Sequence, residues 1–215
     1  EKGDPAMIVL KHVRKSFGRE EVLRDVSAAF ESGCIHGLVG RNGSGKTVLL
    51  KCIAGLIPAD GGVIRVDGKR IGTDIETPPR LGAIIETPGF LPNYSGYRNL
   101  RFLADIRGKI GKDEIFDAME RVGLDPKSPK WVSRYSLGMR QRLGIAQAIM
   151  ETPSLLILDE PMNGLDNAGV KHMRRLFAEL CGEGRTILLA SHNPLDIDQL
   201  CETVSQMDRG VLTSL

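Results

Sequence analysis

The stretch Gly40-Arg41-Asn42-Gly43-Ser44-Gly45-Lys46-Thr47 constrains this chain more than any other. It fits the phosphate-binding loop G-x-x-x-x-G-K-[ST], and an apolar run at 35–39 precedes it while a helical pattern at 48–54 follows it. Glycines permit a tight turn and let backbone N–H groups approach an anion, which the positive start of the next helix also attracts. The segment therefore predicts a strand, a loop and a helix that hold the phosphates of a nucleotide. A glycine-rich turn that merely caps a helix is the simpler alternative.

The residues of this loop have separate expected roles. Lys46 should reach the β and γ phosphates, and the Thr47 hydroxyl should bind Mg²⁺. The rest of the phosphate cradle comes from Gly40, Asn42, Gly43, Ser44 and Gly45.

Composition agrees with one catalytic domain. The 215 residues, 41% of them hydrophobic and 26% charged, suffice for one α/β domain with an inserted subdomain but not for two domains. The net charge is +2 and the basic residues are scattered, which argues against a nucleic-acid partner. Apolar runs fall far short of the roughly 20 residues of a membrane span. Four widely spaced cysteines without a C-x-x-C pair favour reduced thiols in a cytosolic protein.

The order of patterns predicts an α/β fold: a P-loop NTPase core with a mostly parallel sheet, an antiparallel β subdomain at its edge and an inserted α-helical lobe. Two strands at 7–13 and 21–30, joined by a turn over 14–20, predict the antiparallel pair that covers the edge of the main sheet. Further strands are expected at 63–66, 81–85, 155–159 and 186–190, and helices at 99–107, 113–122, 139–150, 169–181 and 194–201.

These patterns divide residues 7–215, taken as a single domain, into two parts. Residues 7–95 and 151–215 should form the α/β core with its β subdomain, and about 96–150 the helical lobe. Residues 1–6 are interpreted as a cloning remnant outside the fold.

Two acids follow the buried apolar run 155–158. Asp159 and Glu160 should project from the carboxyl end of a strand, where ligands of open α/β sheets bind. Asp159 can hold Mg²⁺, and Glu160 can polarise the attacking water. A solvated turn after a core strand is the alternative.

Ser136 and Gly138 form a second candidate anion site. Ser136 is a natural N-cap, and Gly138 leaves the helix start bare of a side chain. Because this helix end belongs to the helical lobe, we expect it to reach the phosphates held by another copy of the chain rather than its own.

At this point the residues resemble the ATP-binding-cassette (ABC) ATPase family, from Met7 almost to the carboxyl end. Segments 40–47 and 155–160 look like Walker A and Walker B, with Glu160 as the catalytic glutamate, and 136–139 looks like the family signature. The resemblance further implies a D-loop at 163–166 that includes Asp166, a catalytic switch histidine at His192, and an adenine-stacking aromatic at Phe17.

The family implies ATP and Mg²⁺ as cofactors and a head-to-tail pair of cassettes that encloses two ATP molecules. The second cassette would be another copy or a paralogous ATPase subunit. Hydrolysis would separate the two cassettes, and this movement would be passed to transmembrane permease subunits. The chain would therefore lie at the cytoplasmic face of the cell membrane.

Two features depart from the usual family pattern. Leu137 and Met139 replace a glycine and a glutamine of the signature, and Glu86 stands where most members have a glutamine. A carboxylate at that position can still bind Mg²⁺ but cannot donate a hydrogen bond. Together, 85–90 and 135–139 look most like ATPase subunits of bacterial exporters for bacteriocins, lantibiotics and bacitracin-type peptides, which predicts a function in antibiotic resistance or immunity.

Two other functions remain open on the sequence. A soluble cassette ATPase that acts on DNA, ribosomes or iron–sulfur assembly is one, although neither a long inserted coiled coil nor a second cassette is present. A small P-loop kinase is the other, and the signature segment and the paired acids argue against it.

Overall fold

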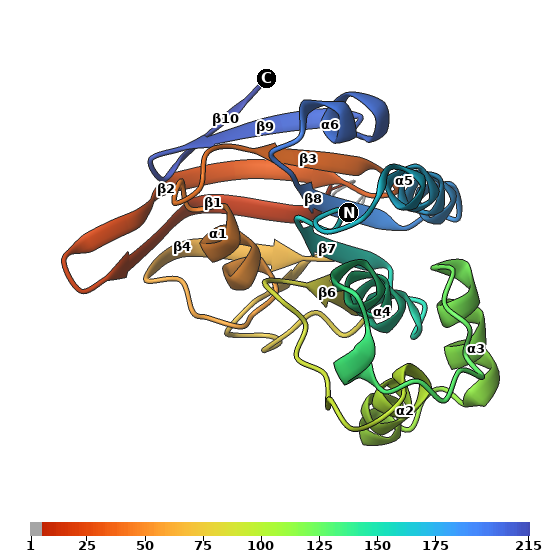
Figure 1. Cartoon of the computed structure of the whole chain (residues 1–215). Coiled ribbons are helices and arrows are strands. Elements are labelled where there is room, and N and C mark those ends of the chain that lie inside the picture. The colour runs from red at the N-terminus through yellow and green to blue at the C-terminus, as the bar shows by residue number, and fades with distance from the viewer. Residues whose placement is uncertain (1–5) are drawn as a thin grey trace.

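The structure is a computed structural model that describes residues 6–215, so the remnant expected at the amino end lies outside the described residues, apart from the backbone of Ala6. Two β-sheets meet at an angle, and the helices pack on and beside them (Figure 1). The strands are β1 (Ala6–Phe17), β2 (Glu20–Glu31), β3 (Ile35–Val39), β4 (Gly61–Val66), β5 (Lys69–Arg70), β6 (Leu81–Ile84), β7 (Leu155–Asp159), β8 (Thr186–Ala190), β9 (Thr203–Asp208) and β10 (Val211–Ser214). The helices are α1 (Lys46–Ile53), α2 (Gly96–Arg107), α3 (Lys112–Arg121), the 3₁₀ turn η1 (Val132–Arg134), α4 (Leu137–Ile149), α5 (Asn167–Gly182) and α6 (Pro194–Leu200).

The main sheet has the strand order β10-β9-β3-β8-β7-β6. Its strands β9, β3, β8, β7 and β6 pair in parallel and β10 pairs antiparallel to β9, so the prediction of a mostly parallel sheet is confirmed. Every residue of β8 is buried, as are 155–158 of β7, because both faces of this sheet are covered. The carboxyl ends of β3, β6, β7 and β8 therefore meet along one edge, where the site lies.

The second sheet is antiparallel, with the order β2-β1-β4-β5. The predicted turn over 14–20 is wrong: β1 continues to Phe17, which pairs with Glu20. Two contacts keep the polar end of β1 in the strand, because Asp60 accepts hydrogen bonds from the Lys15 ammonium and from the Ser16 backbone N–H, both at 2.7 Å. The hairpin also joins β4 and β5 in a sheet of its own, so the prediction of a separate antiparallel β subdomain is confirmed.

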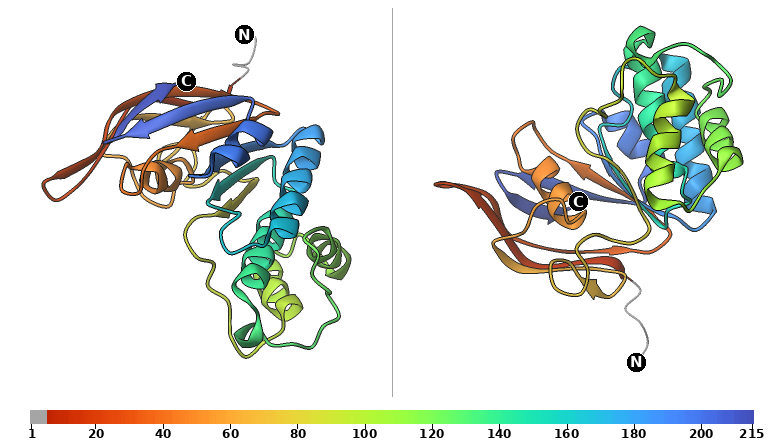
Figure 2. Two further views of the ribbon diagram at one scale, coloured as in Figure 1. Left: turned by 45° about the horizontal axis from the view of Figure 1, so that its top comes forward. Right: turned by 90° about the horizontal axis from the view of Figure 1, so that it is seen from below.

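Three helices, α2, α3 and α4, lie together on one side of the main sheet (Figure 2). All three predicted helices of this region form, and each starts one to three residues earlier than expected. Buried residues of α4, among them Leu143, Ala146 and Ile149, belong to the same apolar cluster as Ile84 of β6 and Leu156 of β7. The close fit of α4 on β6 depends on Gly82, since a Cβ built there would come within 2.0 Å of the Ala148 carbonyl oxygen.

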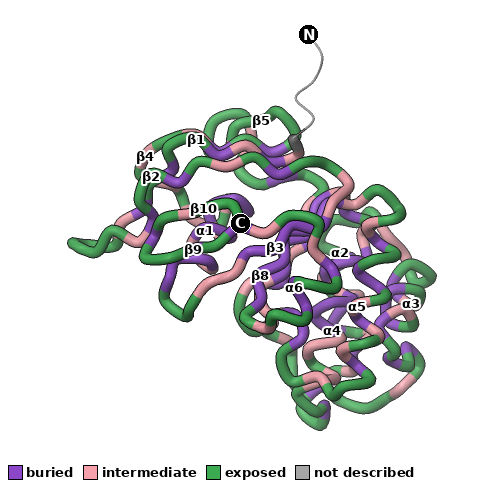
Figure 3. Tube along the Cα trace, turned by 90° about the horizontal axis from the view of Figure 1, so that it is seen from above, coloured by how far each residue is buried: buried purple, intermediate pink, exposed green. Residues whose placement is uncertain are grey.

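The buried segments concentrate in β3, β7, β8 and the helix faces that pack on them (Figure 3). All four cysteines are free thiols, and burial raises the pKa of Cys52 to about 11 and that of Cys201 to about 12. Both therefore stay protonated at neutral pH. Within residues 6–215, no helix combines the length and the hydropathy needed to cross a bilayer.

Candidate functional site

The loop 40–45 connects β3 to α1 and has the backbone conformation that only glycine adopts readily. Gly40, Gly43 and Gly45 have φ angles of 151°, 77° and 109°. A Cβ on Gly40 would lie 2.3 Å from the Met207 carbonyl oxygen, and one on Gly45 would lie 2.9 Å from that of Val22. Larger residues are therefore excluded by both backbone strain and lack of space.

The polar groups of this loop are poorly satisfied by the protein itself. Helix α1 starts without a side-chain cap, whereas Ser136 caps α4 and Asp166 caps α5. The Ser44 hydroxyl is buried and has no hydrogen-bond partner. Lys46 is 6% exposed, and its ammonium donates to the carbonyls of Gly40 at 2.6 Å and Arg41 at 3.1 Å. Uncapped amides, an orphaned hydroxyl and a buried cation together fit a chain of phosphates.

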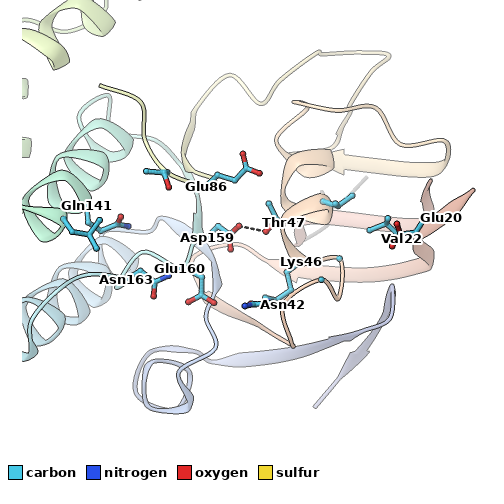
Figure 4. A pocket seen from close by; sticks show the side chains of 15 residues that line it. Glu20, Val22, Asn42, Lys46, Thr47, Glu86, Gln141, Asp159, Glu160 and Asn163 are labelled. Carbon is cyan, nitrogen blue, oxygen red and sulfur yellow. Dashed lines mark hydrogen bonds between the residues drawn. The ribbon is translucent and has the colours of Figure 1, made fainter. Parts of the chain in front are cut away.

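A cavity of about 690 Å³ opens beside this loop. Figure 4 shows Lys46 and Asn42 on one side of it and Gln141 of α4 on the other. Its lining contains eight of the residues predicted from the sequence: Asn42, Gly43, Gly45, Lys46, Thr47, Glu86, Asp159 and Glu160.

Two of the three predicted metal ligands, Thr47 and Asp159, contact each other directly. The Thr47 hydroxyl donates a hydrogen bond of 2.7 Å to Oδ2 of Asp159, across 112 positions of sequence (Figure 4). A hydroxyl and a carboxylate, both oxygen donors, thus face the cavity beside Lys46. This is the donor chemistry that Mg²⁺ prefers, and it leaves room for phosphate oxygens and water in the remaining positions.

The next acid in the chain, Glu160, is held in a strained backbone conformation. Its φ angle is 50°, in the left-handed region, and its N–H donates to the Ala190 carbonyl at the end of β8. Its Oε2 lies 2.8 Å from Nδ1 of His192. Strain of this kind in a cavity wall is typical of functional residues.

Glu86 also has a positive φ angle, 64°, and lines the cavity where the chain leaves β6. Its carboxylate lies 2.7 Å from the ammonium of Lys51, which is one helical turn beyond Thr47 on α1. The sequence analysis missed Lys51, because its partner is 35 positions away and the pattern of α1 gave no signal for it.

Several predicted site residues do not line this cavity. Phe17 ends β1 with 52% of its surface exposed, and Gly40 and His192 line a second cavity on the other side of the loop. Ser136 accepts a hydrogen bond from the Met139 N–H, and a Cβ on Gly138 would come within 2.9 Å of the Gly164 carbonyl oxygen.

Asp166 is also engaged elsewhere, since it caps α5 by accepting from the Gly169 N–H at 2.8 Å. Ser136 is not among the residues that line the cavity beside Lys46, although its neighbour Leu137 is.

The sequence analysis also missed residues that close the cavity. Gln141, one turn into α4, donates to the Pro161 carbonyl at 3.0 Å and thereby ties α4 to the segment after Glu160. Leu137 and Asn163 line the cavity on the same side, and Glu20 and Val22 of β2 line it on the other. Gln141 and Leu137 are four residues apart on a helix, a spacing that places both on one face.

Comparisons with known proteins agree with this geometry. The family model described as "ABC transporter" matches residues 23–163. An uncharacterised ABC transporter ATP-binding protein of Bacillus subtilis, YybJ, is 41% identical over 96% of this chain and 94% of its own length. The bacitracin transport ATP-binding protein BcrA of Enterococcus faecalis is 42% identical over 96% of this chain and 68% of its own.

Among solved structures, an ATP-binding subunit of an ABC transporter superposes with a TM-score of 0.86 at 25% identity, covering 97% of this chain and 90% of that one. The family match covers residues 23–163, and the two relatives extend the similarity over 96% of the chain. This chain therefore belongs to the ABC transporter family, as one of its ATP-binding ATPase subunits.

Proposed function

We propose that this chain hydrolyses ATP with Mg²⁺ to drive a separate membrane permease that exports an antimicrobial peptide or antibiotic. The substrate class is supported by the similarity to a bacitracin transport ATP-binding protein and by the likeness of 85–90 and 135–139 to peptide exporters. The sequence alternatives that act on DNA, ribosomes or iron–sulfur assembly, or as a kinase, are not favoured by these relatives.

The phosphate chain of ATP would lie on the loop 40–47. The free N–H groups at the start of α1 and the Ser44 hydroxyl are the donors for it, with Asn42 and Gly43 at its rim. Lys46 would exchange its bonds to two loop carbonyls for bonds to the β and γ phosphates. That exchange costs little desolvation, because Lys46 is already buried.

Thr47 and Asp159 would hold Mg²⁺, which supplies neutralisation of the phosphate charge when bound. The contact between their oxygens, 2.7 Å, is the observation that carries the proposal, because it joins the phosphate loop to the acidic end of β7. Glu86 is the third candidate ligand, with its carboxylate engaged by Lys51.

Glu160 would take a proton from the attacking water, and His192 would donate a hydrogen bond to the γ phosphate. Their side chains contact each other at 2.8 Å, so His192 reaches the phosphate cavity through Glu160, which lines it. A positioned base contributes about 10²- to 10⁴-fold to the rate.

A second cassette would complete the site. Ser136, Gly138 and the start of α4 would bind the γ phosphate held by the partner, and Asp166 would lie at the contact between the two cassettes. Phe17, half exposed at the end of β1, would stack on the adenine. Residues 7–215 would form one domain in which the helical lobe, about 96–150, presents Ser136 to the partner.

The permease would contact exposed aromatic side chains on and around α2, namely Tyr94, Phe102 and Trp131. Tyr94 and Phe102 stack edge to face at 5.1 Å, and an antiparallel backbone bridge between Ser95 and Trp131 brings the two segments side by side. Exposed aromatic clusters of this kind mark protein interfaces. This contact with the permease would hold the chain at the cytoplasmic face of the membrane.

One experiment tests the transport proposal. A sensitive bacterium is given this chain together with a candidate permease of this transporter class, and its resistance to bacitracin and to a lantibiotic is measured. We expect resistance with the wild-type chain and none with Asp159→Asn, although both chains are produced at the same level. Equal sensitivity of the two strains, with ATP hydrolysis intact in the purified wild type, would reject the substrate class.

A further inference from the structure

A buried ionic network lies behind the loop that carries His192. Asp196 on α6 is 1% exposed, and its Oδ1 accepts hydrogen bonds from Nε and Nη2 of Arg174 on α5, at 2.9 and 2.5 Å. The other oxygen of Asp196 accepts from the Ser191 hydroxyl at 3.2 Å. Arg174 also donates to Gln199 at 2.7 Å. Both carboxylate oxygens of Asp196 therefore have partners.

Stability alone does not explain such a pair. Taking two charges out of water costs several kcal/mol per ion, and well-packed apolar residues in place of a buried ion pair are often neutral or stabilising. A fully hydrogen-bonded pair does, however, fix the geometry of whatever is attached to it. The network therefore matters for the segment that it holds in place.

The network holds both neighbours of His192. The Ser191 hydroxyl donates to Asp196 and accepts from the Asn193 N–H at 3.1 Å. Asn193 in turn caps α6 by accepting from the Leu195 N–H at 3.1 Å. The backbone is thus fixed on each side of His192, while the imidazole itself, 64% exposed, contacts Glu160.

The other end of the network reaches the far side of the site. Arg174 lies two turns into α5, whose first residues follow Asp166 directly. The segment that starts at Glu160 and the loop that carries His192 are therefore connected twice, once at the cavity by the Glu160–His192 contact and once behind it by Arg174 and Asp196.

We propose that Arg174, Asp196 and Ser191 are positioning residues that keep the His192 imidazole in register with Glu160 during ATP hydrolysis. The inference rests on the proposed function, in which Glu160 and His192 act at the γ phosphate. Arg174, Asp196 and Ser191 do not line the phosphate cavity, and their side chains do not bond to Thr47 or Asp159, so loss of the network should alter the rate of the chemical step and leave ATP binding unchanged. A misplacement of about 1 Å can cost on the order of 10²-fold in rate.

The test separates orientation from stability. The double variant Arg174→Met, Asp196→Leu replaces the pair by apolar side chains, and Ser191→Ala removes only the link to the His192 loop. Melting temperature, KM for ATP and kcat are measured for each. Arg107→Met with Glu151→Leu, which removes the ion pair of 2.7 Å between α2 and the end of α4, is the matched control.

We expect the Arg174–Asp196 double variant to keep the wild-type melting temperature and a KM for ATP within about twofold of wild type. Its kcat should fall about 10- to 100-fold. Ser191→Ala should lower kcat about 3- to 10-fold in the wild type, and should add nothing in the double variant, because the two changes break one chain of contacts. The control should keep the wild-type kcat.

A folded double variant with the wild-type kcat overturns the inference, as does a loss of kcat that the control shares. If the double variant does not fold, Ser191→Ala decides alone, and a wild-type kcat refutes the inference. His192→Ala distinguishes a failure of the proposed role of His192 from a failure of the positioning role of the network. If it keeps the wild-type kcat, the proposed role of His192 fails; if it is slow while the double variant is normal, only the positioning role fails.

Discussion

Oε2 of Glu160 lies 2.8 Å from Nδ1 of His192, although 32 positions of sequence separate the two residues. They follow adjacent parallel strands, and the Glu160 N–H donates to the last carbonyl of β8, so the sheet fixes the Glu160 backbone beside the start of the His192 loop. The contact ties the proposed base to the proposed γ-phosphate sensor.

The first prediction concerns Glu160. Glu160→Gln keeps the size of the side chain but removes the basic carboxylate, so kcat should fall about 10²- to 10⁴-fold while the affinity for ATP changes less than about threefold. Single-turnover hydrolysis and binding of a fluorescent ATP analogue measure the two effects. Glu21→Gln, on β2 outside the lining of the cavity, is the control and should keep the wild-type kcat. Unreduced hydrolysis in Glu160→Gln would remove this residue from the chemistry.

The second prediction concerns the ion pair between Lys51 and Glu86. If the ammonium and Mg²⁺ compete for one carboxylate, Lys51→Met should lower the Mg²⁺ concentration needed for half-maximal hydrolysis. Ion pairs as exposed as this one contribute about 0.2–1 kcal/mol, which corresponds to a change of up to about fivefold. Calorimetry of Mn²⁺ binding to the complex with ATP gives a second measurement of the metal affinity.

The same substitution in a Glu86→Gln background is the matched control. There the Mg²⁺ requirement should no longer respond to Lys51→Met, because the contested carboxylate is gone. An equal shift in both backgrounds would mean that Lys51 acts only through its long-range charge, and that Glu86 is not a ligand.

The third prediction tests the packing of α4 on β6. Gly82→Ala should lower the free energy of unfolding by about 1–3 kcal/mol, because the new methyl group would meet the Ala148 carbonyl oxygen at 2.0 Å. Gly182→Ala, at the end of α5, points into open space and should leave stability unchanged or raise it by up to about 1 kcal/mol. Urea denaturation of both variants measures the difference. Similar stability of the two would show that α4 does not pack on β6 as described.

Much of the core could be predicted because its signals are local. Strands β7 and β8 have the expected bounds, since continuous apolar runs between turn residues are typical of buried parallel strands. The phosphate loop, the paired acids after β7 and the Ser136 cap are all short motifs whose geometry follows from neighbouring residues.

The rest depends on contacts distant in sequence. Strands β9 and β10 were missed because both are short and contain several polar residues, such as Thr203 and Gln206 of β9. The polar end of β1 remains a strand only because Asp60 satisfies Lys15 and Ser16. Lys51 and Arg174 gave no sequence signal, because each becomes meaningful only through a carboxylate that the fold brings beside it.

The central claim is that two chains build each ATP site, with Lys46 from one and Ser136 from the other. Two variants are compared in a Glu160→Gln background, Ser136→Arg and the matched control Ser95→Arg, which removes the equivalent N-cap of α2. Sedimentation with and without ATP gives the mass, and a fluorescent ATP analogue gives the affinity of the monomer.

We predict that Glu160→Gln alone and the Ser95 variant become dimers in ATP. The Ser136 variant should remain a monomer and keep the same affinity for the nucleotide. The account is contradicted if Glu160→Gln remains monomeric in saturating ATP, or if Ser136→Arg abolishes nucleotide binding by the isolated chain.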